Sequence, residues 1–397
     1  MLGSASDWRK PSRRVLSFID QGANAQGERR RLLLVLGALL AGAVTAAAFS
    51  LNAYAAPPAD PYKALGQSYS DKGQYDRAIK MYDQAIKLDP TDANAFLDRG
   101  NAYRASGQPD RAIEDYDRSS ALNPHNYLIF VSRGKVYNDK GEYARAIEDF
   151  DKALALNRLD ANAFINRGNS YRATGKLDPA LQDYNQAIKL DPGNWVAYIN
   201  RGKVYNDKGQ HDHAVQDLNR AIALNPKDAN AFLHRGIAHR GKGRHDLANK
   251  DLGQAIRLNP DDPVAFIVRG RSYNDKGQYD LAIKDLDRAV ALAPNDANAF
   301  LGRGDAYRGQ GKQDLALQDY DRAIMRDPGN AIAFISRANA YNDEGRYDLA
   351  IKDLDRAIEL DPSDANALRI HGDASAALEA QDRAARGFDQ AESKPRP

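Results

Sequence analysis

The chain has 397 residues, and its content of 28% charged and 43% hydrophobic residues is normal for a folded protein. It has no cysteine, which excludes disulfides, thiolate metal sites and a thiol nucleophile. Residues 1–31 carry seven basic against three acidic residues, so the remainder, with 49 basic and 51 acidic residues, is close to neutral. This balance argues against nucleic acid as the main ligand.

The first 56 residues are predicted to lie outside the repetitive part of the chain. Residues 1–31 are polar and basic, and we expect them to be disordered. Residues 32–56 follow a cluster of three arginines and are almost entirely apolar, which predicts one apolar helix long enough to cross a bilayer. This segment is either a signal-anchor (transmembrane) helix or a signal peptide, since Ala53-Tyr54-Ala55 is typical of a cleavage site.

The charge distribution around the apolar segment predicts where the rest of the chain lies. Basic residues precede the segment, and the next one after it is Lys63, so the N-terminus is expected in the cytoplasm and the remainder outside it. The sequence therefore predicts a cell-envelope protein. It is either a single-pass inner-membrane protein with a periplasmic array or, after cleavage, a periplasmic one, and a cytoplasmic location is disfavoured.

From residue 59 the same residue types return every 34 positions without insertion or deletion. Numbering each unit from 1, position 4 is aromatic, position 8 is small and position 11 is nearly always Tyr, which places the three on one face of a helix. The small residue lets a second helix come close. That helix follows a turn Gly and has Ala at position 20, a large side chain at 24 and Ala at 27 except for Ser119. Position 34 is always Asp or Asn, which can cap the first helix of the next unit. The linker at residues 57 and 58 leads into nine such units, at 59–92, 93–126, 127–160, 161–194, 195–228, 229–262, 263–296, 297–330 and 331–364.

The last part of the chain keeps some of these positions and loses others. Residues 365–391 retain Leu368, Gly372 and Phe388 in register, but Glu379 replaces the turn Gly. Terminal units of repeat arrays are atypical because one face meets water. We therefore expect a tenth, degenerate capping repeat at 365–391, followed by a loose tail at 392–397.

The period and the Phe/Gly/Tyr…Ala/Tyr/Ala…Pro pattern resemble the tetratricopeptide (TPR) repeat family over residues 57–364. The resemblance implies an all-α fold, a right-handed α-solenoid (superhelix) of helix-turn-helix repeats, with the first helices lining a concave groove. It also implies a protein that binds partner proteins or peptides.

Two columns of the repeat predict an internal ion pair. Position 7 is Arg and position 23 is Asp in repeats 2 to 9, and both are absent from repeat 1 and from the last unit. Eight identical copies are implausible for one active site, so we interpret the columns as an ion pair between the two helices of each repeat, such as Arg201 with Asp217.

A second period of 68 residues is superimposed, because odd and even repeats differ at several positions. It reflects either recent duplication of a two-repeat cassette or a groove whose chemistry repeats every second unit. In this family, first-helix positions 2, 5, 9, 12 and 13 usually face the groove. Here they offer carboxamides, an aliphatic floor and mixed charges spaced i and i+4, as in Lys135 with Asp139, which suits an extended peptide. The alternative is that the aliphatic position 5 is core between repeats and that the charges neutralise one another in solvent. The candidate partner-binding residues are Asn94, Lys135, Asp139, Asn162, Ile165, Arg172, Ile199, Lys203, Asp207, Asn230, Leu233, Arg240, Ile267, Arg271, Asp275 and Asn298.

Motifs for catalysis, metal binding or cofactor binding were not found. Five histidines cluster at residues 211–245, mostly in columns otherwise rich in Tyr, so we interpret them as packing substitutions. The sequence therefore predicts a non-enzymatic interaction scaffold without a cofactor that binds peptide segments or partner proteins and no nucleic acid. The alternatives are a structural protein that self-associates into an oligomer, and an accessory subunit of an envelope enzyme or glycan-handling complex.

Overall fold

A computed structural model describes residues 60–392 of the chain. The predicted disordered segment 1–31, the predicted apolar helix 32–56 and nearly all of the predicted tail lie outside these residues. Within the described part every regular element is an α-helix, and strands are absent. None of these described helices is both long enough and apolar enough to span a bilayer.

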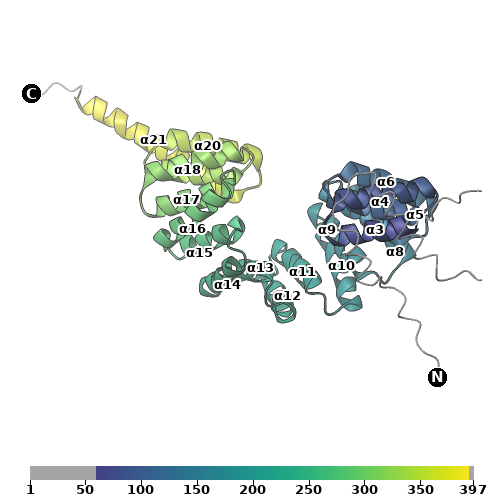
Figure 1. The fold of residues 1–397 in the computed structure, drawn as a ribbon. Helices are drawn as coiled ribbons and strands as arrows, with labels where there is room; N and C mark the ends of the chain where they lie inside the picture. The colour runs from purple at the N-terminus through teal and green to yellow at the C-terminus, as the bar shows by residue number, and fades with distance from the viewer. Residues whose placement is uncertain (1–59, 393–397) are drawn as a thin grey trace, which may run out of the picture. The chain divides into compact units, whose positions relative to one another are not determined.

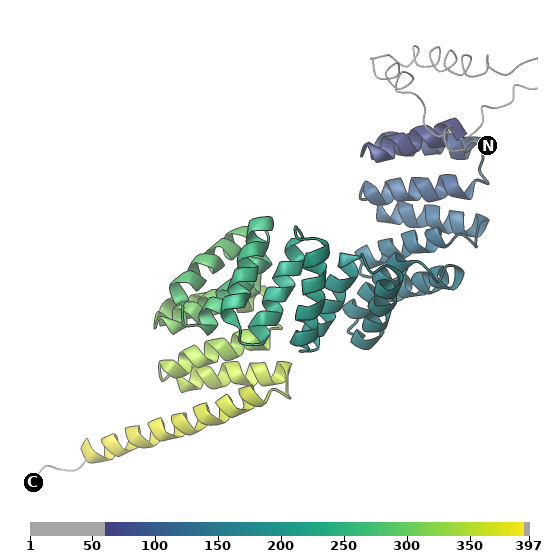
Figure 2. The same ribbon diagram turned by 90° about the horizontal axis from the view of Figure 1, so that it is seen from below.

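The described residues form nine helical hairpins and one final helix (Figure 1). Each helix packs against the next along the chain, and antiparallel neighbours lie side by side in Figure 2. The helix-turn-helix prediction is therefore confirmed. The first helices are α3 (Asp60–Asp71), α5 (Ala93–Ala105), α7 (Tyr127–Asp139), α9 (Ala161–Ala173), α11 (Trp195–Asp207), α13 (Ala229–Gly241), α15 (Pro263–Asp275), α17 (Ala297–Gly309) and α19 (Ala331–Asp343). The second helices are α4 (Tyr75–Leu88), α6 (Pro109–Leu122), α8 (Tyr143–Leu156), α10 (Leu177–Leu190), α12 (His211–Leu224), α14 (His245–Leu258), α16 (Tyr279–Leu292), α18 (Gln313–Arg326) and α20 (Tyr347–Leu360).

The capping residues and turn glycines of the repeat determine where the helices end. The Asp or Asn before each first helix from α5 to α19 caps it; for example, the Asp160 carboxylate accepts hydrogen bonds from the backbone amides of Asn162 and Ala163. Each turn Gly, from Gly73 to Gly345, has a φ between 67° and 78°. Glycine adopts this left-handed conformation without the steric cost that a Cβ would impose.

The small residue at position 8 lets the two helices of a repeat approach closely. A Cβ added to Gly168 on α9 would lie 2.8 Å from the ring of Tyr184 on α10, nearer than real atoms pack. The same contact recurs with Phe150 over Gly134 and with Leu218 over Gly202. The predicted close approach at this column is confirmed.

The predicted ion pair is present in all eight repeats that carry the two residues, and it extends further than expected. Arg201 binds Asp217 through two parallel hydrogen bonds of 2.7 and 2.6 Å. Its remaining amino group donates to Asn185 on the second helix of the preceding repeat, at 2.6 Å. Six of the other seven arginines make the same bridge, so each ties its own hairpin to the one before it.

Repeat 7 is the exception, because the preceding repeat has Gly253 at the bridging position. Arg269 still binds Asp285 through two hydrogen bonds. The residue that accepts the bridging hydrogen bond is Asp or Asn in the other repeats, whereas Gly253 has no side chain to accept it. The junction between repeats 6 and 7 therefore lacks this bridge.

The end of the array differs from the prediction. Residues 365–391 were expected to form a degenerate hairpin, but α21 (Ala365–Glu392) is one continuous helix. Glu379 occupies the position of the turn Gly, and the surrounding alanines favour helix, so nothing reverses the chain. Ala367, Ile370 and Ala374 pack on α20, and the second half of α21 projects past it in Figures 1 and 2.

Candidate binding groove

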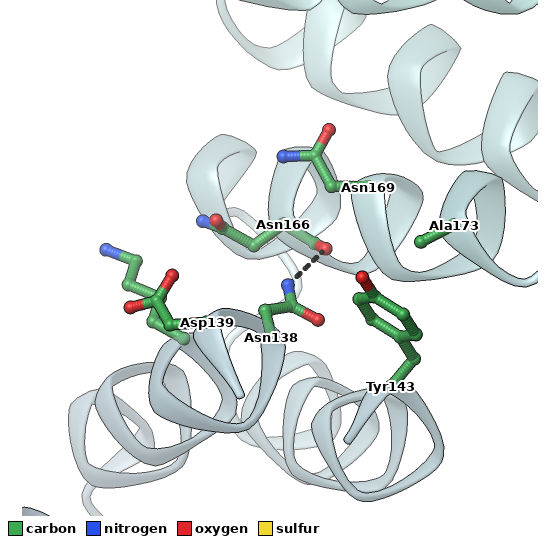
Figure 3. A pocket seen from close by; sticks show the side chains of 7 residues that line it. Asn138, Asp139, Tyr143, Asn166, Asn169 and Ala173 are labelled. Atoms are coloured by element: carbon green, nitrogen blue, oxygen red, sulfur yellow. Dashed lines mark hydrogen bonds between the residues drawn. The ribbon is translucent and has the colours of Figure 1, made fainter. Parts of the chain in front are cut away.

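Two adjoining depressions in the groove lie over repeats 3 to 5. One depression of about 270 Å³ lies between α7 and α9 and is bordered by Tyr143 at the start of α8 (Figure 3). An adjoining depression of about 520 Å³ continues across α9 to the start of α11. Together we call them the central hollow; its lining residues are Lys135, Asn138, Asp139, Tyr143, Asn162, Ile165, Asn166, Asn169, Ala173, Asp191, Gly193, Asn194, Trp195 and Val196.

Hydrogen bonds fix the orientation of two carboxamides in the central hollow. The oxygen of Asn169 accepts from the Tyr184 hydroxyl at 2.7 Å and from the Asn200 amide at 3.0 Å, so its own NH₂ group is left as a donor. Asn166 instead spends its NH₂ group on the backbone carbonyl of Asn162, at 2.7 Å, and keeps its oxygen as an acceptor. A donor and an acceptor thus lie one helical turn apart on α9, the pair that one backbone peptide group requires.

Position 9 of repeats 3, 5 and 7 places a cation in the groove. Lys135 and Lys203 are half-buried, and burial lowers the pKa of both ammonium groups, with further lowering by Arg104 and Arg172 respectively. Burial also lowers the pKa of Arg271, whose guanidinium donates to Asn298 at 2.9 Å.

The predicted pairing of these cations with the Asp four residues later is wrong. Asp207 pairs with Arg172 of the preceding repeat at 3.1 Å, and Asp275 pairs with Arg240 at 2.7 Å. A third such pair, Arg308 with Asp343 at 2.6 Å, repeats the pattern. The carboxylates are therefore engaged across repeats, and neither Lys135 nor Lys203 has a carboxylate within 4 Å among the described residues.

The predicted aliphatic floor is mostly core. Ile199, Leu233 and Ile267 are 4–5% exposed and belong to the hydrophobic clusters between successive hairpins. Ile165 is equally buried but borders the central hollow. These positions therefore hold the repeats together and offer a ligand little surface.

Position 2 of the first helices is accessible throughout the array. Asn94, Asn162, Asn230 and Asn298 are exposed in even repeats, and Leu128, Val196, Val264 and Ile332 are exposed in odd ones. Carboxamide and aliphatic side chains therefore alternate along one edge. Trp195, immediately before Val196, adds the one aromatic ring at this edge of the central hollow, and its indole N–H donates to Asp228 at 3.1 Å.

The 68-residue period corresponds to two kinds of junction between repeats. From an odd to an even repeat, Asn206 donates to the backbone carbonyl of His234 at 2.9 Å, and the ring of His211 lies over Gly241. Asn138 with Asn166, and Tyr279 over Gly309, repeat these two contacts (Figure 3 shows the first). From an even to an odd repeat, the junctions of repeats 4 and 5, 6 and 7, and 8 and 9 instead carry the pairs Arg172–Asp207, Arg240–Asp275 and Arg308–Asp343.

The histidine cluster shows no metal-binding geometry. No group of three or more His, Asp or Glu side chains that could hold a metal ion occurs among residues 60–392. Burial lowers the pKa of His234 to about 3, with smaller contributions from Lys203 and Arg172, so this imidazole is neutral at physiological pH. His239 is buried and lies 3.7 Å from Asp251.

Serial helical hairpins with a polar groove define an α-solenoid of the class that scaffolds protein interactions. Family models agree with this class. Models described as "TPR repeat" match residues 66–106, 134–171, 168–207 and 202–243, and models described as "Tetratricopeptide repeat" match residues 93–126, 229–262, 267–331 and 331–364. The chain belongs to the tetratricopeptide repeat family.

Two solved structures share this fold at low identity. A chain of the APC/C hetero-tetramer Cut9-Hcn1 is 17% identical with a TM-score of 0.57, covering 80% of this chain and 76% of that one. A tetratricopeptide repeat protein from Parabacteroides merdae is 20% identical with a TM-score of 0.53, covering 62% of this chain and 98% of that one. No curated protein sequence matches the chain. The likeness at these identities concerns the fold.

Proposed function

We propose that this protein is a scaffold that binds extended peptide segments of partner proteins in its groove, centred on the central hollow. The observation that supports the proposal is the pair of oriented carboxamides, Asn166 and Asn169, in the central hollow. An acceptor and a donor held in this way can hydrogen-bond one peptide group of an extended chain without reading its side chains.

The walls of the central hollow suit the side chains of such a segment. Trp195 and Val196, each more than a third exposed, form an apolar wall beside the carboxamides. A segment bound along α9 would place a side chain against this wall, and the fixed rotamers reduce the entropy lost on binding. Binding is thus expected to combine backbone hydrogen bonds with one apolar contact.

Capture of partners in cells tests the proposal. The chain would carry a photo-crosslinking amino acid in place of Val196, and crosslinked peptides would be identified by mass spectrometry. Replacing Asn166 and Asn169 by Ala should abolish the crosslinks, whereas replacing the exposed Asn295, in the loop between α16 and α17, should leave them unchanged. Crosslinks that survive loss of both carboxamides would contradict groove binding at this place.

We further propose that the array functions in the cell envelope. The support comes from the sequence, in which basic residues precede the apolar run 32–56. In a bacterial host, fusing alkaline phosphatase after residue 392 should give an active enzyme, because that enzyme folds outside the cytoplasm. An inactive phosphatase fusion together with a fluorescent cytoplasmic fusion would place the array inside the cell and overturn this part of the proposal.

A further inference from the structure

Two lysines in the groove differ from the other half-buried lysines of the described chain. The half-buried lysines are Lys63, Lys135, Lys203, Lys208 and Lys242. Lys63, Lys208 and Lys242 each pair with a carboxylate, on Asp92, Asp178 and Asp212 respectively. Lys135 and Lys203 have no carboxylate within 4 Å among residues 60–392. They occupy the same position of repeats 3 and 5.

The carboxylates one helical turn after these two cations do not pair with them. Asp207, one turn after Lys203, is bound by Arg172. Asp139, one turn after Lys135, is exposed on the rim. Each lysine is repelled by an arginine of the preceding repeat, Arg104 or Arg172, and this repulsion is larger than the attraction of the nearby helix-capping carboxylate, Asp160 for Lys135 and Asp228 for Lys203. Both ammonium groups are therefore partly desolvated, are not neutralised, and lower the stability of the free protein.

An anion bound at each lysine would supply the missing charge. The groove already offers carboxamides for a peptide backbone next to Lys135, and its wall at Trp195 and Val196 is apolar. A free phosphate would use neither feature, and the near-neutral charge of residues 32–397 argues against nucleic acid. Resting on the proposed function, we infer that the bound segment is an acidic peptide that places one carboxylate at Lys135 and a second at Lys203.

The stacking of the helices sets the distance between the two carboxylates. α7 contacts α9, and α9 contacts α11. Since contacting helices lie about 8–10 Å apart, Lys135 on α7 and Lys203 on α11 are on the order of 16–20 Å apart along the groove. An extended chain rises about 3.3 Å per residue, so the two acidic residues should be about five or six positions apart.

Fluorescence anisotropy with labelled synthetic peptides tests this inference on the full-length protein. The probe carries two glutamates about six positions apart, separated by alternating Ser and Val. One comparison peptide has Gln in place of both glutamates, and another has the glutamates two positions apart. Lys135→Met and Lys203→Met remove one cation each and keep the side-chain length. Lys284→Met, an exposed lysine on α16, is the matched control for net charge.

The expected result is that the widely spaced acidic probe binds best. Each groove variant should weaken it by about tenfold, in line with the loss of one charged hydrogen bond, and Lys284→Met should not. Binding of the Gln peptide should be insensitive to both groove variants. Thermal melting provides a readout that misfolding cannot mimic, since Lys135→Met should melt at a higher temperature than the wild type while binding the probe less well.

Three outcomes would overturn the inference. Equal affinity for the Glu and Gln peptides would show a groove that ignores charge, while the proposed peptide scaffold would stand. Equal loss with Lys284→Met would indicate a diffuse effect of net charge. Binding of a single-stranded oligonucleotide or of inorganic phosphate in place of the acidic probe, with the same dependence on Lys135 and Lys203, would assign the lysines to another class of ligand.

Discussion

The ion pair between Arg201 and Asp217 allows a quantitative test of what holds the two helices of a repeat together. Asp217 is 5% exposed, and both of its oxygens are bound by Arg201. In Asp217→Ala the guanidinium loses two charged hydrogen bonds and keeps the one to Asn185. Breaking a buried pair costs roughly 3–5 kcal/mol. Because Arg201 is partly solvated and retains Asn185, we expect a loss of about 3 kcal/mol.

The same change should have a different effect once the arginine is absent. In Arg201→Leu the Asp217 carboxylate is buried without its partner, so replacing it by Ala removes an unfavourable charge. The cost of Asp217→Ala should then fall to about zero or become a small gain, which gives a coupling energy of at least about 2 kcal/mol.

Urea unfolding followed by circular dichroism measures all four proteins of this cycle. The m-value should stay constant across them, since a change in m would indicate that parts of the array unfold separately. Asn185→Ala is the matched control, because it removes the bridge to the preceding repeat and leaves the pair intact, and it should cost about 1 kcal/mol. Equal losses for Asp217→Ala in the two backgrounds would refute the pairing.

Three further changes test the junctions and the charges. Gly253→Asp should restore the missing bridge to Arg269 and stabilise the array by about 1 kcal/mol in urea unfolding, and the gain should shrink in an Arg269→Leu background. Burial, aided by Asp92, raises the pKa of Asp98 to about 6, so its ionisation costs stability as pH rises from about 4 through 6. Asp98→Asn should therefore remove that part of the pH dependence and stabilise the protein at pH 7 by about 1–2 kcal/mol after allowance for solvent screening, whereas a lower midpoint at pH 7 would contradict the assignment. Deletion of residues 195–262 keeps an even repeat before an odd one, whereas deletion of 195–228 joins two even repeats. The protein that lacks 195–262 should therefore be the more stable of the two in urea, although it is shorter. The reverse order would show that the junctions are interchangeable.

The features that the sequence predicted are those set within a single hairpin. The period and the side chains at positions 4, 8 and 24 determine the face of each helix, so the contact of Tyr184 with Gly168 and the pairing of Arg201 with Asp217 could be predicted from their columns. The capping residues and turn glycines determined the helix ends for the same reason, since both act on the backbone within a few residues.

The features that the sequence did not predict depend on how neighbouring repeats stack. The i to i+4 rule favoured Lys203 with Asp207, but the stacking brings Arg172 of the preceding repeat to that carboxylate. Similarly, burial of Ile199 depends on the following hairpin, which covers it. The final helix was misjudged because the retained residues Gly372 and Phe388 suggested a hairpin, while the loss of the turn Gly at Glu379 decided the outcome. The alternation between odd and even repeats could be seen in the sequence. Which positions contact each other between neighbouring repeats can be seen only in the structure.

The two kinds of junction also bear on how such a self-similar chain finds its native state. Nearly identical units compete for the same neighbours during folding, and a hairpin that docks one repeat out of place would be a kinetic trap. A slip of one unit puts like junctions together: Arg172 would face Gly241 in place of Asp207, and the error would lack its ion pair. The alternation of junctions therefore destabilises structures in which a hairpin docks one repeat out of place. It does not destabilise those in which a hairpin docks two repeats out of place.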